Sequence, residues 1–212
     1  MCFSAQASLT ASGLLAILGA LSLYKMPSKK YVMCALTPLF FAVQQLAEGI
    51  LWLTMNDPIY ESWVHVSMYV FIFFAWIVWP TWIPTTLWFI EKDKIRKQIL
   101  FIPMGLGIFL SGLAIKGLSS TQLIVRLVDG HIVYEAVSGT WQVMPLLIMY
   151  ACAVITPFFI SSVRRIWLFG LAVLVSLCVS YVVWYEALGS VWCFFAALIS
   201  GSILYFVSEQ KK

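Results

Sequence analysis

The stretch Gln44-Gln45-Leu46-Ala47-Glu48-Gly49-Ile50-Leu51-Trp52 places a carboxylate within an apolar segment that runs from about residue 31 to residue 55. A transmembrane helix needs about 20 mainly apolar residues, so this segment is long enough to cross a bilayer. A charge at the centre of such a helix costs roughly 2.5–3.5 kcal/mol on insertion scales, and such residues usually face the protein interior. Glu48 is the only acidic residue inside the apolar segments of this chain. We therefore expect the other helices to surround it.

The composition is that of a membrane protein. The 212 residues are 62% hydrophobic and only 10% charged, whereas soluble domains carry about 25% charged residues. We therefore expect one transmembrane domain, residues 1–212, with no separate soluble domain. The net charge of +4 does not indicate nucleic-acid binding, because the positions of the basic residues explain it better. The first residues lack the basic region of a signal peptide, so we expect the first apolar segment to be retained.

Apolar segments long enough to form membrane helices recur seven times, which predicts an all-α, seven-transmembrane helix bundle. The third segment contains Trp79-Pro80-Thr81-Trp82-Ile83-Pro84, where proline should kink the helix because it lacks an amide hydrogen. Trp76, Trp79, Trp82 and Trp88 are typical of an aromatic belt at the membrane interface. The predicted helices cover residues 6–24, 31–55, 62–90, 98–117, 141–161, 166–185 and 188–207.

Basic residues cluster in alternate loops of this predicted bundle. The other loops contain only Lys116 and Arg126. Cytoplasmic loops are enriched in lysine and arginine, so the pattern puts the N-terminus outside and the C-terminus in the cytoplasm. The basic clusters are Lys25, Lys29 and Lys30; Lys92, Lys94, Arg96 and Lys97; Arg164 and Arg165; and Lys211 and Lys212.

The long external loop predicts a β-hairpin at about residues 122–137. Asp129-Gly130 separates two runs of β-formers, which is a strong hairpin signal. A two-residue turn would pair Val128 with His131 and Arg126 with Val133. Apolar and polar side chains alternate along both strands, which predicts an amphipathic hairpin over the outer mouth of the bundle. Its apolar face would hold Leu123, Val125, Leu127, Ile132, Tyr134 and Ala136, and its polar face Arg126, His131 and Glu135.

The short turn Asn56-Asp57-Pro58 joins the second and third helices, so these helices should be antiparallel neighbours. Glu48 and His65 are equally far from this turn in the sequence. At 1.5 Å rise per residue, both should lie about 10 Å in from the turn, on the outer side. Further polar side chains fall one turn away from them, namely Gln44, Gln45 and Tyr69.

Cysteines join these residues in the outer half of the bundle. Cys178 and Cys193 are nearly symmetric about the turn after the sixth helix, and Cys2 begins the chain on the same side. Thiolate, imidazole and carboxylate are the ligands that zinc prefers. We therefore predict a zinc site formed by Cys2, Glu48 and His65. Equal depth alone does not establish a Cys178–Cys193 disulfide. Further candidate site residues are Gln44, Gln45, Tyr69 and Cys193.

Two explanations without a metal stay open for Glu48. As a catalytic residue, Glu48 could act as a general base beside His65. As a structural residue, Glu48 could join helices through hydrogen bonds to Gln44, Tyr69 or His65, or could carry a proton.

The opening Met1-Cys2-Phe3-Ser4-Ala5, the stretch Gln44-Gln45-Leu46-x-Glu48-Gly49 and the late Trp192-Cys193 resemble a family of uncharacterised bacterial integral membrane proteins that begin MCFSA. The resemblance covers most of the chain. It implies a bacterial membrane protein and no particular activity. We expect this protein to be a multi-pass protein of the bacterial inner membrane.

Three functions fit these residues. The first is a zinc-dependent hydrolase or hydratase embedded in the membrane, with Glu48 and His65 as catalytic residues. The second is a proton- or cation-coupled transporter or channel for a small molecule, with Glu48 as the ion site. The third is a sensor or haem-binding protein with His65 or Cys2 as axial ligand. We expect the lipid bilayer and an unknown small-molecule or lipid substrate as partners, expect no nucleic acid, and leave a homo-oligomer open.

Overall fold

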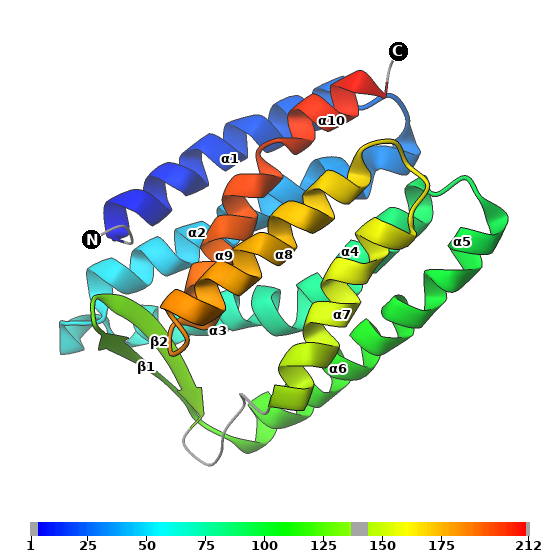
Figure 1. Cartoon of the computed structure of the whole chain (residues 1–212). Helices are drawn as coiled ribbons and strands as arrows, with labels where there is room; N and C mark the ends of the chain where they lie inside the picture. The colour runs from blue at the N-terminus through cyan, green and yellow to red at the C-terminus, as the bar shows by residue number, and fades with distance from the viewer. Residues whose placement is uncertain (1–3, 137–143, 211–212) are drawn as a thin grey trace.

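The computed structural model describes residues 4–136 and 144–210. These residues form a bundle of helices with a two-stranded hairpin at one end (Figure 1). The α-helices are α1 (Ala5–Lys25), α2 (Val32–Thr54), α3 (Glu61–Ile72), α4 (Trp79–Ile90), α5 (Lys94–Ile99), α6 (Phe101–Ser120), α7 (Met144–Ile160), α8 (Ile166–Val183), α9 (Leu188–Ser200) and α10 (Ile203–Glu209). Three short segments extend them, namely the 3₁₀ turns η1 (Lys29–Tyr31) and η2 (Pro58–Tyr60) and the π-helix η3 (Phe73–Val78).

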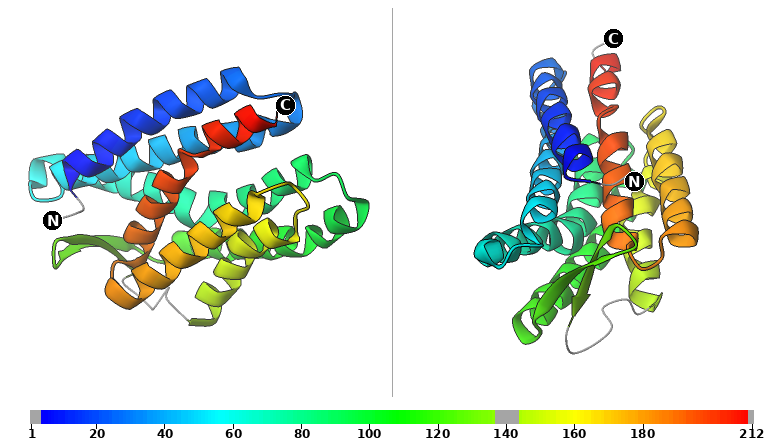
Figure 2. Two further views of the ribbon diagram at one scale, coloured as in Figure 1. Left: turned by 45° about the horizontal axis from the view of Figure 1, so that its top comes forward. Right: turned by 90° about the vertical axis from the view of Figure 1, so that its left-hand side faces the viewer.

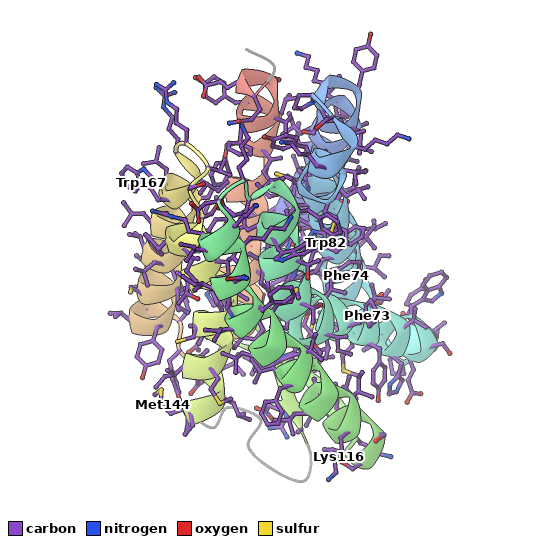
Figure 3. All side chains as sticks on the ribbon, turned by 90° about the vertical axis from the view of Figure 1, so that its right-hand side faces the viewer. Phe73, Phe74, Trp82, Lys116, Met144 and Trp167 are labelled. Carbon is purple, nitrogen blue, oxygen red and sulfur yellow. The ribbon has the colours of Figure 1, made fainter. Side chains whose placement is uncertain are left out.

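Several of these elements run on into one another, so the described residues contain seven helical segments. Six of them are long and apolar enough to cross a membrane. The seventh, α7, is apolar and has 17 described residues. The finding supports a multi-pass membrane protein, and the predicted boundaries agree with the observed ones to within a few residues. The exposed surface fits this environment, because large apolar side chains such as Trp167 point outward from the bundle (Figure 3).

Local sequence explains where several helices begin. The Ser4 hydroxyl accepts a hydrogen bond from the amide of Ala7 at 3.3 Å, which caps α1. Asp57 and Asp93 cap η2 and α5 in the same way, with bonds of 3.0 and 2.9 Å from amides in the first turn. Such caps satisfy amides that have no partner inside the helix.

The predicted kink of the third segment is present, and the bend lies at η3, before the two prolines. Figure 3 shows the chain bending at Phe73 and Phe74 between α3 and α4. Pro80 lacks an amide hydrogen, so the regular helical bonding pattern cannot continue through it. Near this bend the carbonyl oxygens of Ala75 and Ile77 also accept side-chain hydrogen bonds, from Tyr150 at 2.6 Å and from Ser111 at 2.9 Å. Both donors come from other helices, which fixes the bend within the bundle.

The predicted aromatic belt is wrong for Trp79. This side chain is only 3% exposed and stacks on Phe41 with ring centroids 3.9 Å apart. Its indole nitrogen donates a hydrogen bond to Gln44. Trp82, one turn later, donates to the hydroxyl of Thr37 at 3.1 Å. The bend turns this tryptophan-rich face of α4 toward α2 instead of toward lipid.

Helix α1 packs along α2 at small residues. A Cβ atom added to Gly49 would lie 2.6 Å from the Leu9 side chain, and one added to Gly19 would lie 2.6 Å from that of Leu39. Small residues let membrane helices approach each other closely. The contact between Leu9 and Gly49 brings the start of α1 beside the stretch that contains Glu48.

The loops that carry the basic clusters lie together, at what we call the basic end of the bundle. Arg165 pairs there with Glu209 at 3.1 Å, and the Arg96 guanidinium donates to the carbonyl of Ile160 at 3.0 Å. The hairpin lies at the opposite end, beside the α8–α9 turn (Figure 2). We call this the hairpin end.

Glu91 joins two loops at the basic end, outside the membrane-spanning segments. Its carboxylate accepts hydrogen bonds from the amides of Lys92 and Asp93 and from both the amide and the hydroxyl of Ser162. The Ser161 hydroxyl donates another at 2.8 Å. Burial acts to raise the pKa of Glu91, but these hydrogen bonds outweigh it and lower the pKa to about 2. The charged carboxylate therefore holds the α4–α5 loop against the α7–α8 loop.

The predicted hairpin is confirmed, with strands β1 (Leu123–Val128) and β2 (His131–Ala136). Val128 pairs with His131 and Arg126 with Val133, as expected. Asp129 and Gly130 have φ angles of 49° and 77°, the positive values that a tight two-residue turn requires.

The predicted polar face of the hairpin is exposed at Arg126 and Glu135, whose side chains pair with each other, but part of this face is also covered by helices. Leu123 and Ile132 on one face pack against α2 and α3. Val133, on the face expected to be polar, packs against Ala187 and Val191 of the α9 region. The hairpin therefore fills a gap between the helices and helps to build their interior.

Candidate functional site

Glu48 lies in the interior at the hairpin end of α2 and is 2% exposed. The Ser190 hydroxyl, from α9, donates a hydrogen bond to its Oε1 atom. The Gln45 amide, one turn earlier on α2, donates to Oε2 at 3.2 Å. Among the described residues, no lysine, arginine or histidine forms an ion pair with Glu48. The carboxyl group is thus held only by neutral donors.

Gln44 joins three helices beside this carboxyl group. Its Oε1 atom accepts from the Trp79 indole nitrogen of α4 at 2.8 Å, and its amide donates to the Phe71 carbonyl of α3 at 3.5 Å. Gln44 is completely buried. The two bonds hold α3 and α4 against α2. We call Gln44, Gln45, Glu48 and Ser190 the Glu48 cluster.

Two buried polar atoms in or beside the cluster have no hydrogen-bond partner within the described residues. They are the Oε1 atom of Gln45, in the cluster, and the hydroxyl of Tyr134, beside it. Tyr134 comes from β2 and stacks on Phe71, with centroids 4.6 Å apart and an interplanar angle of 7°. Burial raises the pKa of the Tyr134 phenol well above its ordinary value, and the nearby Glu48 and Cys193 add to this effect. The phenol is therefore a neutral donor without an acceptor in residues 4–136 and 144–210.

A pocket at the hairpin end opens beside the cluster, and we call it the outer pocket. It contains about 1040 Å³ of empty space, part of which is open to the outside. Ser190 and Cys193 of α9 line it, so the hydroxyl that binds Glu48 belongs to its wall. Much of the remaining wall is aromatic, formed by Phe71, Trp76, Tyr134, Tyr150, Tyr185 and Trp192.

The charges around the outer pocket are acidic. Glu135 and Glu186 line it, and no lysine, arginine or histidine is among its described lining residues. Glu135 is paired with Arg126 of β1, with 3.4 Å between the Nε and Oε2 atoms. Glu186 and the buried Glu48 remain as acidic groups without an ion pair among the described residues.

The structure brings together four of the candidate site residues, Gln44, Gln45, Glu48 and Cys193. The Cys193 thiol is buried and lies close enough to Glu48 to interact with it electrostatically. Cys178 is exposed, and both cysteines are free thiols, so they do not form a disulfide.

The structure does not bring His65 or Tyr69 to Glu48. The His65 side chain is 56% exposed, and its Nε2 atom lies 3.8 Å from Glu61 on its own helix. Tyr69, one turn later, is 40% exposed. Counting residues from the turn predicts the depth of a side chain along the bundle but not the direction in which it points.

The predicted zinc ligands therefore do not assemble in the part of the chain that the structure describes. Within residues 4–136 and 144–210, no group of three or more His, Cys, Asp or Glu side chains could hold a metal ion. Cys2, the third predicted ligand, lies outside the described residues. The zinc site and the haem alternative, which relied on His65 or Cys2, stay untested predictions.

Sequence reasoning missed Ser190 and Tyr134. Ser190 precedes Cys193 by one helical turn, a spacing that would have put both on one face of α9. Tyr134 was correctly assigned to the apolar face of the hairpin, but no sequence signal showed that this face contacts Phe71 beside Glu48.

Comparison with known proteins gives a family but no activity. The model of a family of unknown function, DUF6629, matches residues 1–212. Neither the curated proteins nor the solved structures contain a match to the chain.

Proposed function

The chain belongs to a family of unknown function, DUF6629, so we infer its function from the Glu48 cluster. We propose that the outer pocket binds a small organic cation and that Glu48 supplies the compensating negative charge. The observation that carries this proposal is the position of Ser190, which lines the pocket and donates to Glu48. The carboxyl group thus lies one side chain behind the pocket wall.

The neutral surroundings of Glu48 support a cationic ligand. A buried carboxylate is stable only if it is neutralised or paired, because an isolated charge loses its hydration. Its partners, Ser190 and Gln45, are neutral. A cation that enters the outer pocket would supply the missing partner, and a proton would supply it when the pocket is empty.

The aromatic wall supports the same class of ligand. Cations bind to the faces of Trp, Tyr and Phe rings, and aromatic cages are used to recognise quaternary ammonium groups. The rings of Trp76, Tyr185 and Trp192 line the outer pocket together with Glu186. The same wall disfavours anionic ligands, because no basic side chain among the described residues lines it.

Exchange of a proton for the cation at Glu48 would couple the binding of the two, as a proton-coupled transporter requires. The bundle would lie in a bacterial cytoplasmic membrane with the N-terminus and the hairpin end outside, as the loop charges indicate. The outer pocket would then receive its ligand from the outside. The bend at η3 lies in this wall, since Ala75 and Trp76 line the outer pocket.

A zinc-dependent hydrolase or hydratase is the second candidate, and it needs Cys2. The contact between Leu9 and Gly49 favours it, because this contact holds the start of α1 beside Glu48. Such a site would use Cys2 and Glu48, with a ligand other than His65. Elemental analysis tests it: about one zinc per chain that is lost in Cys2→Ser would support the enzyme and count against the cation site.

The cation site is tested by measuring tetramethylammonium binding to the protein in nanodiscs. We expect Glu48→Gln to weaken binding at least tenfold, because the amide keeps the size of the side chain but removes its charge. Glu61→Gln is the matched control, since Glu61 is exposed at the start of α3 and should leave affinity within twofold.

A pH series on the same samples tests the coupling. Protons should compete with the cation at Glu48, so wild-type affinity should fall as the pH is lowered, and the Glu48→Gln variant should lose this dependence. Equal affinity of the wild-type protein and Glu48→Gln would refute the cation site.

A further inference from the structure

A second pocket lies next to the outer pocket, deeper in the bundle, and we call it the inner pocket. It contains about 800 Å³ of empty space between α2, α4 and α7–α10, part of which is open to the outside. Tyr150, Trp192 and Cys193 line both pockets, so these three side chains form the boundary between the two. The inner pocket extends from this boundary to Ile166 and Phe206, which belong to the apolar cluster toward the basic end.

The walls of the inner pocket differ chemically from those of the outer one. No charged side chain among the described residues lines the inner pocket. Its few hydroxyl groups include Thr37, which already binds the Trp82 indole, and Ser200, which donates to a carbonyl of its own helix. The Thr86 hydroxyl also belongs to this wall and has no hydrogen-bond partner among the described residues. Such a cavity suits hydrocarbon, since apolar cavities in proteins stay dry and bind apolar ligands.

The boundary residues present apolar surfaces to the two cavities. The Tyr150 hydroxyl donates to the Ala75 carbonyl at 2.6 Å, and the Trp192 indole nitrogen donates to the Val173 carbonyl at 3.3 Å. Their rings meet edge to face with centroids 5.7 Å apart. Because backbone carbonyls satisfy both polar atoms, the boundary offers only the two rings and the Cys193 thiol to a ligand that spans the pockets, and the rings would have to move apart to admit an alkyl chain.

We propose that the inner pocket holds the hydrocarbon tail of the ligand whose cationic head lies in the outer pocket. The substrate class is then a single-chain amphiphile with an ammonium head. This inference rests on the proposed function and adds the tail to it. The ammonium head would lie in the outer pocket, beside the Glu48 cluster and the aromatic wall. The hydrocarbon tail would lie in the uncharged inner pocket, beyond Trp192.

Matched probes with and without a tail test the inference in nanodiscs. Tetramethylammonium reaches only the outer pocket, whereas decyltrimethylammonium, used below its micellar concentration, also reaches the inner one. Ala196 lines the inner pocket on α9, so Ala196→Phe should fill part of it. We expect Ala196→Phe to weaken decyltrimethylammonium binding at least tenfold and to leave tetramethylammonium binding within twofold.

The controls separate the tail inference from the cation site. Leu198→Phe puts the same side chain on the outside of α9, where Leu198 is 51% exposed, and should change neither affinity. Glu48→Gln should weaken both probes. If decyltrimethylammonium binds Ala196→Phe as well as it binds the wild type, the tail inference is wrong and the cation site stands. If neither probe binds the wild type, both proposals are wrong.

Photolabelling identifies the occupant and remains informative if Ala196→Phe does not fold. A diazirine at the end of the decyl chain should label peptides that contain Val173 and Ile199, which line the inner pocket. Ser200→Leu is the second pocket-filling variant and should reduce that labelling at least fivefold. Phosphatidylcholine with a diazirine in its acyl chain is the comparison. Labelling of these peptides by the lipid alone would assign the cavity to a membrane lipid and overturn the inference.

Discussion

Gly107 of α6 lies against the carbonyl oxygen of Pro80 in α4, so closely that a Cβ atom at Gly107 would be only 1.8 Å from that oxygen. Pro84, four residues after Pro80, has no amide hydrogen, so the usual helical donor to this carbonyl is missing. Helix α6 covers this Pro80 oxygen at Gly107, where the absence of a side chain leaves room for this close contact. The contact fixes the distance between α4 and α6.

Gly107→Ala should therefore destabilise the protein, because the obstructing atom belongs to the backbone and cannot rotate away. We expect a loss of about 1–3 kcal/mol or more, the usual range for overpacking. Thermal unfolding in nanodiscs would measure it. Gly105→Ala is the matched control, since nothing lies within 4 Å of its added Cβ and alanine favours helix. Equal stability of the two variants would contradict this account of the contact.

Ser190→Ala should destabilise the empty protein by about 1–3 kcal/mol, the cost of leaving a buried acceptor with fewer donors. Tetramethylammonium should restore part of this loss, because its positive charge would stabilise the Glu48 carboxylate electrostatically. Melting temperatures with and without the ion measure both effects. Ser202→Ala, which removes an exposed hydroxyl bonded within its own chain segment, should show neither.

Tyr134→Phe should leave stability unchanged or raise it by about 1 kcal/mol, because it removes a buried hydroxyl that has no partner among the described residues. The ring and its stacking on Phe71 are kept. Tyr134→Ala, which removes the ring, should cost about 3–5 kcal/mol, as large-to-small changes in cores do. A loss of stability in Tyr134→Phe as large as that in Tyr134→Ala would show that the hydroxyl is satisfied.

Glu91 should make stability depend on pH below about 5. Its pKa in the folded protein is about 2, lower than its ordinary value of 4.5, so folding favours the charged form. The stabilisation is then complete above the unfolded pKa and is lost as the pH falls toward 2, by about 2–3 kcal/mol in total. Unfolding measured from pH 6 to pH 2 should show this slope in the wild type. The slope should be smaller in Glu91→Gln, and an identical slope in both proteins would assign the effect to other groups.

The two ends of the bundle should be labelled from opposite sides of the membrane. Asp129→Cys, at the hairpin turn, should react in intact cells with a thiol reagent that cannot cross the membrane. Lys94→Cys, at the basic end, should react only after the cells are opened. The opposite result would invert the orientation and make the outer pocket face the cytoplasm.

The sequence predicted the elements well, because each depends on neighbouring residues. Helix boundaries followed the lengths of apolar segments, and the hairpin followed from Asp129-Gly130 between two β-rich runs. The prolines predicted a kink, although the bend itself lies in η3. The surroundings of these elements were harder to predict. Trp79 was expected at the membrane interface and is buried, and the burial of Val133 beside the exposed Arg126 was not foreseen.

The candidate site was predicted in part. Glu48 was identified because a carboxylate in an apolar helix needs partners, and Gln44, Gln45 and Cys193 were correctly placed near it. His65 was expected beside it from depth alone, and the structure places that side chain on the exposed side of α3.

The sequence by itself determined that this chain forms apolar helices, that a tight hairpin interrupts them and that Glu48 needs a partner. These properties follow from hydrophobicity, turn chemistry and the cost of burying a charge, all of which act locally. Only the tertiary structure decided that this partner is Ser190, 142 residues later. It also decided that Tyr134 enters the helix interior and that Tyr150 and Trp192 separate two pockets. The rotation of each helix about its axis depends on the packing of the whole bundle, and no single segment contains that information.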